Sequence, residues 1–286
     1  MVNATTLAVN VILLGALYSL VAIGFTLIFG VGGVLNLAHG ASITIGAYAA
    51  YYVTAAGFSI WAGAAAALLV PAAFSYALYR GMIKRVAEHP IIVLILTLVM
   101  AIIVEQVFLV TAGAQPLAIP RLVEGQTQIL GRAVGNNRIV AVLLSWLVIG
   151  GLFLFVDRTR RGKAILATSM SKKGAAVVGI ESDTVYGYTW IIAGLLAGLA
   201  GLFLASFLTA NPLMGRNPLL LAFSIVVVGG LGSIRGSVVG AYLIALLDQV
   251  TVSAISTRLS GLAALVVLVV VLLVRPEGLF GRELVE

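Results

Sequence analysis

Two carboxylates in this sequence lie inside long apolar segments, where a charged group is rare. Glu105 and Asp248 each lie within a long run of mostly apolar residues. A carboxylate at the centre of a bilayer costs about 2.5–3.5 kcal/mol or more, so it must face protein or water. Each therefore has two interpretations. It contacts a substrate ammonium or relays protons, or it bonds to a neighbouring helix or to an arginine such as Arg258. Gln106 adds polarity beside Glu105 and makes Glu105 the stronger functional candidate.

A second polar feature is the glycine-rich stretch FGVGGVLNLAHG, which contains Asn36, His39 and Gly40. Glycines permit helix breaks, and broken helices often line transport sites because their free backbone groups can face a polar cavity. The stretch is therefore either a broken, pore-lining helix or a short loop between two spans with His39 at the lipid interface. The residues alone leave both interpretations open.

Several kinds of chemistry are excluded by residue usage. The chain has no cysteine and only two histidines, so a thiolate or histidine-rich metal site is not expected. It has no cluster with metal-ligand or acid–base spacing, and we expect no cofactor and no enzymatic activity. It also lacks the G-x-x-x-x-G-K-[ST] motif, so it cannot bind ATP through a P-loop.

Composition identifies the environment that holds these residues. The chain is 62% hydrophobic and 9% charged, against about 25% charged in soluble domains, so lipid must be its solvent. We expect an all-α, multi-pass bundle of about eight to ten spans, with nine as the working number. Gly194, Gly198 and Gly201 form a small-residue face typical of tight helix packing. The expected spans are 7–30, 38–56, 60–79, 91–111, 139–156, 185–209, 218–234, 237–255 and 259–274.

The distribution of basic residues predicts the orientation. With nine spans, twelve of the 17 Lys and Arg residues lie on one side, and basic residues concentrate in cytoplasmic loops. This places the N-terminus outside and the C-terminus in the cytoplasm of a cell-membrane protein. It makes 157–184 a cytoplasmic loop and 112–138 an external loop of one domain, 1–286. The net charge of +7 is thereby explained without nucleic acid.

The loop 157–184 carries six Lys and Arg residues and then a run of small residues. Arg158, Arg160 and Arg161 are expected at the membrane surface, where they would meet anionic lipid headgroups. The following residues predict one or two short helices, broken near Gly174. A cytoplasmic helix with small residues suits close packing against a partner protein.

Four segments, in order, resemble the branched-chain amino acid (LivH/LivM) permeases of ABC importers, and LivH in particular. They are LNLAHG with GAY at 35–48, RRGKA…AAVVGI at 160–180, GGLGS…G at 229–236 and RPEGLFG at 275–281. The family usually has acidic or amide residues midway through the second segment. Here Ser171, Lys172 and Lys173 stand there, which bears on the polarity of the partner's docking surface.

The resemblance implies a permease subunit that imports branched-chain or other hydrophobic amino acids, or related amides or urea, by alternating access. The implied partners are two ATPase subunits, a second permease (a paralogue or a second copy) and an external substrate-binding protein. The implied ATPase-coupling residues are Gly162, Lys163, Ala164, Ala175, Ala176, Gly179 and Ile180. The residues expected along the substrate pathway are Asn36, His39, Gly40, Glu105 and Gln106. The alternative is an ion-coupled secondary transporter that uses an intramembrane carboxylate.

Overall fold

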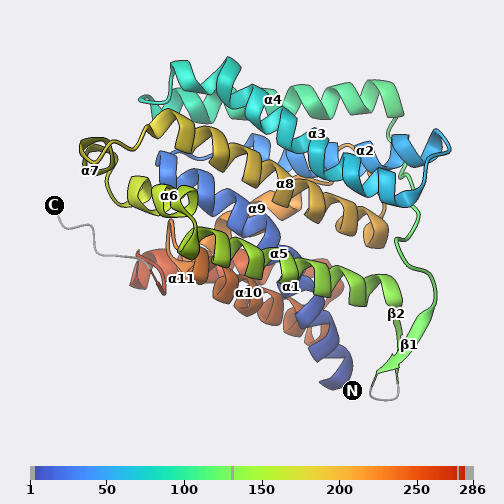
Figure 1. The fold of residues 1–286 in the computed structure, drawn as a ribbon. Coiled ribbons are helices and arrows are strands. Elements are labelled where there is room, and N and C mark those ends of the chain that lie inside the picture. The colour runs from blue at the N-terminus through green and yellow to red at the C-terminus, as the bar shows by residue number, and fades with distance from the viewer. Residues whose placement is uncertain (1–3, 130–131, 276, 281–286) are drawn as a thin grey trace.

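The structure is a computed structural model that describes residues 4–129, 132–275 and 277–280. Figure 1 shows long helices lying side by side, with a β-hairpin at one end of the bundle and α6 and α7 at the other. The helices are α1 Ala4–Gly32, α2 Ala38–Ala55, α3 Ile60–Gly81, α4 Pro90–Ala112, α5 Asn136–Arg158, α6 Arg160–Met170, α7 Lys172–Val177, α8 Ser182–Leu208, α9 Arg216–Gly229, α10 Ile234–Ala254 and α11 Leu262–Val274. Two 3₁₀ turns, η1 Ile83–Arg85 and η2 Thr257–Leu259, and the strands β1 Gln126–Ile129 and β2 Arg132–Gly135 complete the described elements.

Each of the nine expected spans corresponds to a helix, which confirms the helical membrane bundle. Within the described residues, six helices (α1, α3, α4, α5, α8 and α10) are long and apolar enough to cross a membrane. The apolar helices α9 and α11 are shorter. The most apolar stretch of α1 is 83% buried and that of α8 is 67% buried, whereas those of α3, α4 and α5 are 28% buried. The first two are therefore central, and the other three present apolar side chains outward.

Glycine contacts hold the central helices together, as the small-residue face predicts. A Cβ on Gly46 of α2 would lie 2.6 Å from the Cα of Gly198 in α8. A Cβ on Gly194 would lie 2.7 Å from the Cα of Ala72 in α3. Backbones this close leave no room for a side chain, so helix packing is the role of these residues.

The chain between α1 and α2 is a break inside the bundle. Leu37 N donates to Thr97 Oγ1 (3.1 Å), and Thr97 lies about 10 Å along α4 from its first residue. His39 is 1% exposed and lies beside Val21, about 16 Å before the end of α1. The expectation of a surface loop with His39 at the lipid interface is therefore wrong, and the broken helix is the arrangement found.

Two other helices also begin inside the bundle. Gly215, just before α9, packs against Gly40 of α2. A Cβ on Gly40 would lie 2.8 Å from the Gly215 carbonyl oxygen. Gly261, just before α11, donates its N–H to Asp248, within α10. Both helices then run toward the α6–α7 end, where Leu279 N donates to the Val228 carbonyl of α9 (2.8 Å). Pro276 and Gly281 of the C-terminal motif lie outside the described residues.

The segment 112–138, expected as a polar loop, contains an antiparallel hairpin. Gln126 pairs with Gly135, and Ile129 pairs with Arg132. Leu117 and Ala210 exchange backbone hydrogen bonds of 2.8 Å, which fix the segment to the chain beyond α8. The hairpin lies beyond the ends of the helices (Figure 1).

Candidate functional site

The α6–α7 end begins with a sharp corner between α5 and α6. Thr159 caps α6 by accepting from Gly162 N (2.9 Å), and its hydroxyl donates to the Phe155 carbonyl (2.7 Å). A Cβ at Gly162 would collide with the backbone of Phe155 and Val156. Gly162 therefore builds the corner. Lys163 is exposed beside it, and Ala164 is half-buried.

The break between the two short helices lies at Ser171, three residues before the expected break at Gly174. Ser171 is extended (φ −160°, ψ 114°), and its hydroxyl accepts from Gly174 N (3.0 Å). Gly174 instead lies within α7, because serine is the stronger N-cap residue.

The chain after α7 forms a Schellman turn. Gly179 has φ 79°, its N–H donates to the Ala176 carbonyl, and Ile180 N donates to the Ala175 carbonyl (2.9 Å). Apart from its chain neighbours, no described residue has an atom within 4 Å of a Cβ built at Gly179, so the left-handed backbone accounts for this glycine.

The small residues of this segment divide between two faces. Ala175 is 3% exposed, and Ile180 packs against the core. Val177 is 86% exposed and Val178 is 72% exposed. We call the outward surface formed by residues 176–179 the α7 tip. It is apolar and open, whereas Ala175 and Ile180 hold it to the bundle.

Lys172 connects α7 to the end of α1. Its Nζ donates to the Gly32 carbonyl (3.4 Å) and lies 5.2 Å from the centre of the Tyr186 ring. Gly32 is the last residue of α1, next to the break. Lys172 therefore gives α7 a direct polar contact with the segment that leads to Asn36 and His39. A displacement of α7 would act on that segment through this contact.

The basic residues at this end differ in their surroundings. The Arg161 guanidinium lies 4.9 Å from the centre of the Tyr188 ring. Arg158 and Arg160 are exposed, and no ion pair to either exists in the described part of the chain. Asp157 instead pairs with Arg235 of α10 at 3.5 Å. Arg158 and Arg160 are therefore free to meet anionic groups outside the protein.

At the break between α1 and α2, the candidate residues Asn36, His39 and Gly40 lie close together and are buried. Asn36 Oδ1 accepts from the N–H of Ala38 (3.0 Å), the first residue of α2. His39 Nε2 donates to the Val21 carbonyl (3.0 Å). Gly40 faces Gly215, as described above. The amide and the imidazole thus stabilise a helix start within the bundle.

Glu105 forms the one two-point ion pair among the described residues. Arg216 Nε donates to Glu105 Oε1 (2.9 Å), and Arg216 Nη2 donates to Glu105 Oε2 (2.6 Å). At about 1.5 Å per residue, Glu105 lies about 22 Å along α4 from Pro90 and about 10 Å before Ala112. The Glu105 side chain is 10% exposed, but that of Arg216 is 58% exposed. Gln106 does not join this pair and is exposed on another face of α4.

Asp248 has a structural partner, and it is not Arg258. Asp248 accepts from Gly261 N (2.6 Å) and from the Ser260 hydroxyl (3.3 Å), so it caps the start of α11. Across the residues that the structure describes, no group of three or more His, Cys, Asp or Glu side chains is arranged to hold a metal ion.

Sequence reasoning assigned no role to Arg216 or Val178, and it named Lys172 only as a departure from the family's usual residues. One signal was available for Arg216, because an arginine directly before an apolar segment too short to span a bilayer suggests a helix that starts inside it. No sequence signal pairs Arg216 with Glu105 or Lys172 with Gly32, since each pair is more than 100 residues apart.

Known proteins resemble this chain over nearly its whole length. It is 30% identical to the high-affinity branched-chain amino acid transport system permease protein LivH of Escherichia coli K12, with 97% of this chain and 95% of LivH covered. It is 30% identical to the corresponding permease protein BraD of Pseudomonas aeruginosa, with 97% and 96% covered. A probable LivH of Methanocaldococcus jannaschii is 26% identical, with 92% and 88% covered.

Among solved structures, a chain of PsaBC from Streptococcus pneumoniae in complex with Fab has a similar fold. The TM-score is 0.51 at 13% identity, with 94% of this chain and 91% of that chain covered. The family model described as "Branched-chain amino acid transport system / permease component" matches residues 7–273. A match of this extent, over the same helices that carry the break, the ion pair and the α7 tip, places the chain in that family: it is a multi-pass membrane protein of the branched-chain amino acid permease family.

Proposed function

We propose that this chain is the permease subunit of an ATP-driven importer of branched-chain or other hydrophobic amino acids. In this proposal the α6–α7 end faces the cytoplasm, and two separate ATPase subunits bind there. A second permease, a paralogue or another copy, completes the pathway, and an external binding protein delivers substrate at the hairpin end. The observation that carries the proposal is the α7 tip, an exposed apolar surface at the basic end of a membrane bundle.

Coupling would run from the α7 tip to the break between α1 and α2. An ATPase that closes on ATP moves α7, and Lys172 transmits the motion to the Gly32 carbonyl. The adjoining segment carries Asn36, which accepts a hydrogen bond from the first residue of α2. A polar contact of this kind between two helix ends suits a two-state rearrangement of the bundle.

The substrate pathway would pass the Glu105–Arg216 pair. Arg216 is half-exposed at a depth where a guanidinium cannot face lipid without a large cost. The outward face of α4 and α9 at this point must therefore meet water or protein, and a route between two permeases supplies both. A carboxylate and a guanidinium there match the two charges of an amino acid. The break residues Asn36, His39 and Gly40 would support this route from behind, and Gln106 would lie beside it.

The ion-coupled alternative gains no support. The matching family and its relatives are permease components of transport systems. Of the two carboxylates that it would use, Asp248 caps α11 and Glu105 pairs with Arg216.

Uptake by the reconstituted transporter tests the proposed function. Proteoliposomes would contain this chain with its ATPase and second permease, and the binding protein would be added outside. We expect radiolabelled leucine to accumulate only with ATP, and to do so in the presence of an uncoupler. Accumulation without ATP that collapses on adding the uncoupler would show an ion-coupled carrier instead.

Breaking the ion pair is expected to slow transport more than removing a neighbouring polar group. Glu105→Gln or Arg216→Gln leaves the other charge unpaired at membrane depth, so we expect each to lower the maximal uptake rate about ten-fold. Gln106→Leu, the control on the same helix, should change it less than about two-fold. Uptake rates and unfolding temperatures would be measured together. Equal, small effects of all three variants on uptake would show that the pair only supports the fold.

A further inference from the structure

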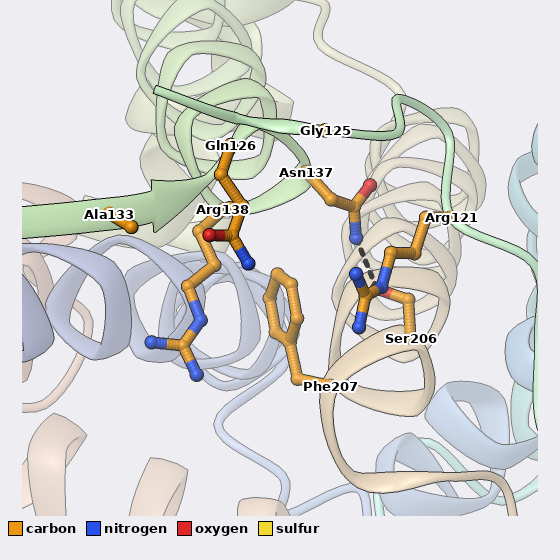
Figure 2. Close-up of a pocket in the computed structure, with 9 residues that line it drawn as sticks. Arg121, Gly125, Gln126, Ala133, Asn137, Arg138, Ser206 and Phe207 are labelled. Atoms are coloured by element: carbon orange, nitrogen blue, oxygen red, sulfur yellow. Dashed lines mark hydrogen bonds between the residues drawn. The ribbon is translucent and has the colours of Figure 1, made fainter. Parts of the chain in front are cut away.

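A pocket of about 300 Å³ opens at the hairpin end, away from the pair and the α7 tip. The hairpin covers it on one side, and the start of α5 and the end of α8 form the others. Figure 2 shows the ring of Phe207 between the side chains of two arginines. Its polar lining consists of Arg121, Gln126, Asn137, Arg138 and Ser206.

The pocket carries positive charge that the protein does not neutralise. Arg121 and Arg138 have no hydrogen bond or ion pair to any residue that the structure describes. Among the described residues, no acidic side chain lines the pocket. The first turn of α5 adds the positive end of a helix dipole, and Gly135 at the N-cap has no side chain that could accept a hydrogen bond there. Two guanidinium groups and a helix start favour an anion.

The walls of the pocket are held in place before any ligand arrives. Asn137 is 3% exposed, and its amide group donates to Ser206 Oγ (3.0 Å), the bond drawn in Figure 2. Its Oδ1 accepts from Leu122 N (3.0 Å), next to Arg121 in the chain. Asn136 N donates to the Gly125 carbonyl, which ties the hairpin to α5. The backbone that carries the two arginines is therefore fixed, so the entropy lost on binding is mainly that of the arginine side chains.

We propose that this pocket binds the carboxylate of a free, amino-acid-sized molecule at the external mouth of the permease. The volume lies at the lower limit for small-molecule sites, which run from about 300 to 1,000 Å³. Phe207 offers an apolar wall beside the cations, so the favoured ligand has a carboxylate and an apolar side chain. The choice of amino acids rests on the proposed function, whereas the preference for a carboxylate rests on the lining alone.

A ligand series tests the charge preference. The assembled transporter in lipid nanodiscs, without the binding protein, would be titrated with leucine, 4-methylpentanoate and 3-methylbutylamine. The acid lacks the ammonium of leucine, and the amine lacks its carboxylate. We expect the acid to bind at least as tightly as leucine and the amine to bind at least about ten-fold more weakly. Equal affinity for the acid and the amine would overturn the proposal.

Variants then locate the site. The double variant Arg121→Gln/Arg138→Gln should weaken binding of 4-methylpentanoate about ten-fold or more, and the double lysine variant should retain more of the affinity. Arg258→Gln, which removes an exposed arginine of η2, is the control and should leave it unchanged. Unchanged binding in the double glutamine variant places the site elsewhere. If no small ligand binds but the double glutamine variant loses affinity for the binding protein, the pocket receives a protein carboxylate, and the proposal fails. ATP-driven uptake by the unmodified transporter, measured in parallel, reports separately on the proposed function.

Discussion

Aspartate at both Val177 and Val178 is expected to abolish coupled transport while the permease still inserts and folds. The two side chains are 86% and 72% exposed and form most of the apolar surface of the α7 tip. If an ATPase covers this surface, each aspartate buries an unpaired charge in the interface, at a cost of at least about 2 kcal/mol. We therefore expect substrate-stimulated ATP hydrolysis and uptake to fall more than about thirty-fold.

The choice of these two valines avoids a structural complication at Gly179. Gly179 adopts a positive φ, so any side chain there strains the backbone whether or not a partner docks. Val177 ends α7 and Val178 follows it, and neither packs against the core. The matched control is Met82→Asp, at another exposed apolar residue of the same end of the bundle, after α3. Normal ATP hydrolysis and uptake in the double aspartate variant, or an equal loss in Met82→Asp, would contradict the docking assignment.

The sequence was sufficient for the helices because apolar length and charge decide where a chain can cross lipid. It was insufficient to predict how deep inside the bundle each helix begins. Residues 210–217, between two expected spans, contain polar groups and were expected to connect them outside the membrane, yet Gly215 reaches Gly40 inside the bundle. Close glycine contacts and the cap from Asp248 to Gly261 set where α9 and α11 begin. These are tertiary contacts, and no local pattern encodes them.

The candidate site divides in the same way. The corner at Gly162 and the turn at Gly179 are set by nearby residues, but the sequence predicted only short helices broken near Gly174, three residues beyond the break found at Ser171. Which residues of this segment face the bundle and which face outward depends on tertiary packing, not on the local sequence. Ala175 and Ala176 are equivalent by composition, but Ala175 is buried by the bundle. Glu105 was a candidate because a carboxylate inside the membrane is energetically unfavourable. The group that offsets this cost, Arg216, lies 111 residues away in the sequence.

Adding a single methyl group at Gly198 is expected to destabilise the bundle, whereas the same change at Gly151 should not. A Cβ at Gly198 would overlap the Ala67 carbonyl oxygen of α3 and lie 2.9 Å from Pro71 Cγ. Gly46 of α2 approaches Gly198 with its backbone, so α8 cannot shift away from α3 without meeting α2. Overpacking a core of this kind costs about 1–3 kcal/mol for small additions, and more where two backbones must separate. We expect Gly198→Ala to lower the unfolding temperature and the yield of folded protein.

Gly151→Ala is the matched control because it makes the same chemical change in a helix of similar length. Apart from its chain neighbours and its own helix backbone, no described residue has an atom within 4 Å of a Cβ built at Gly151, and this residue of α5 is exposed. Alanine restricts the unfolded chain and stabilises a helix by about 0.5–1 kcal/mol relative to glycine, so the unfolding temperature of the Gly151→Ala variant should stay the same or rise. Thermal unfolding followed by size-exclusion chromatography in detergent measures both variants. If Gly198→Ala leaves the unfolding temperature unchanged or raises it, as Gly151→Ala should, then glycine at 198 is not needed for close packing, and the α2–α3–α8 contact is looser than these backbone distances require.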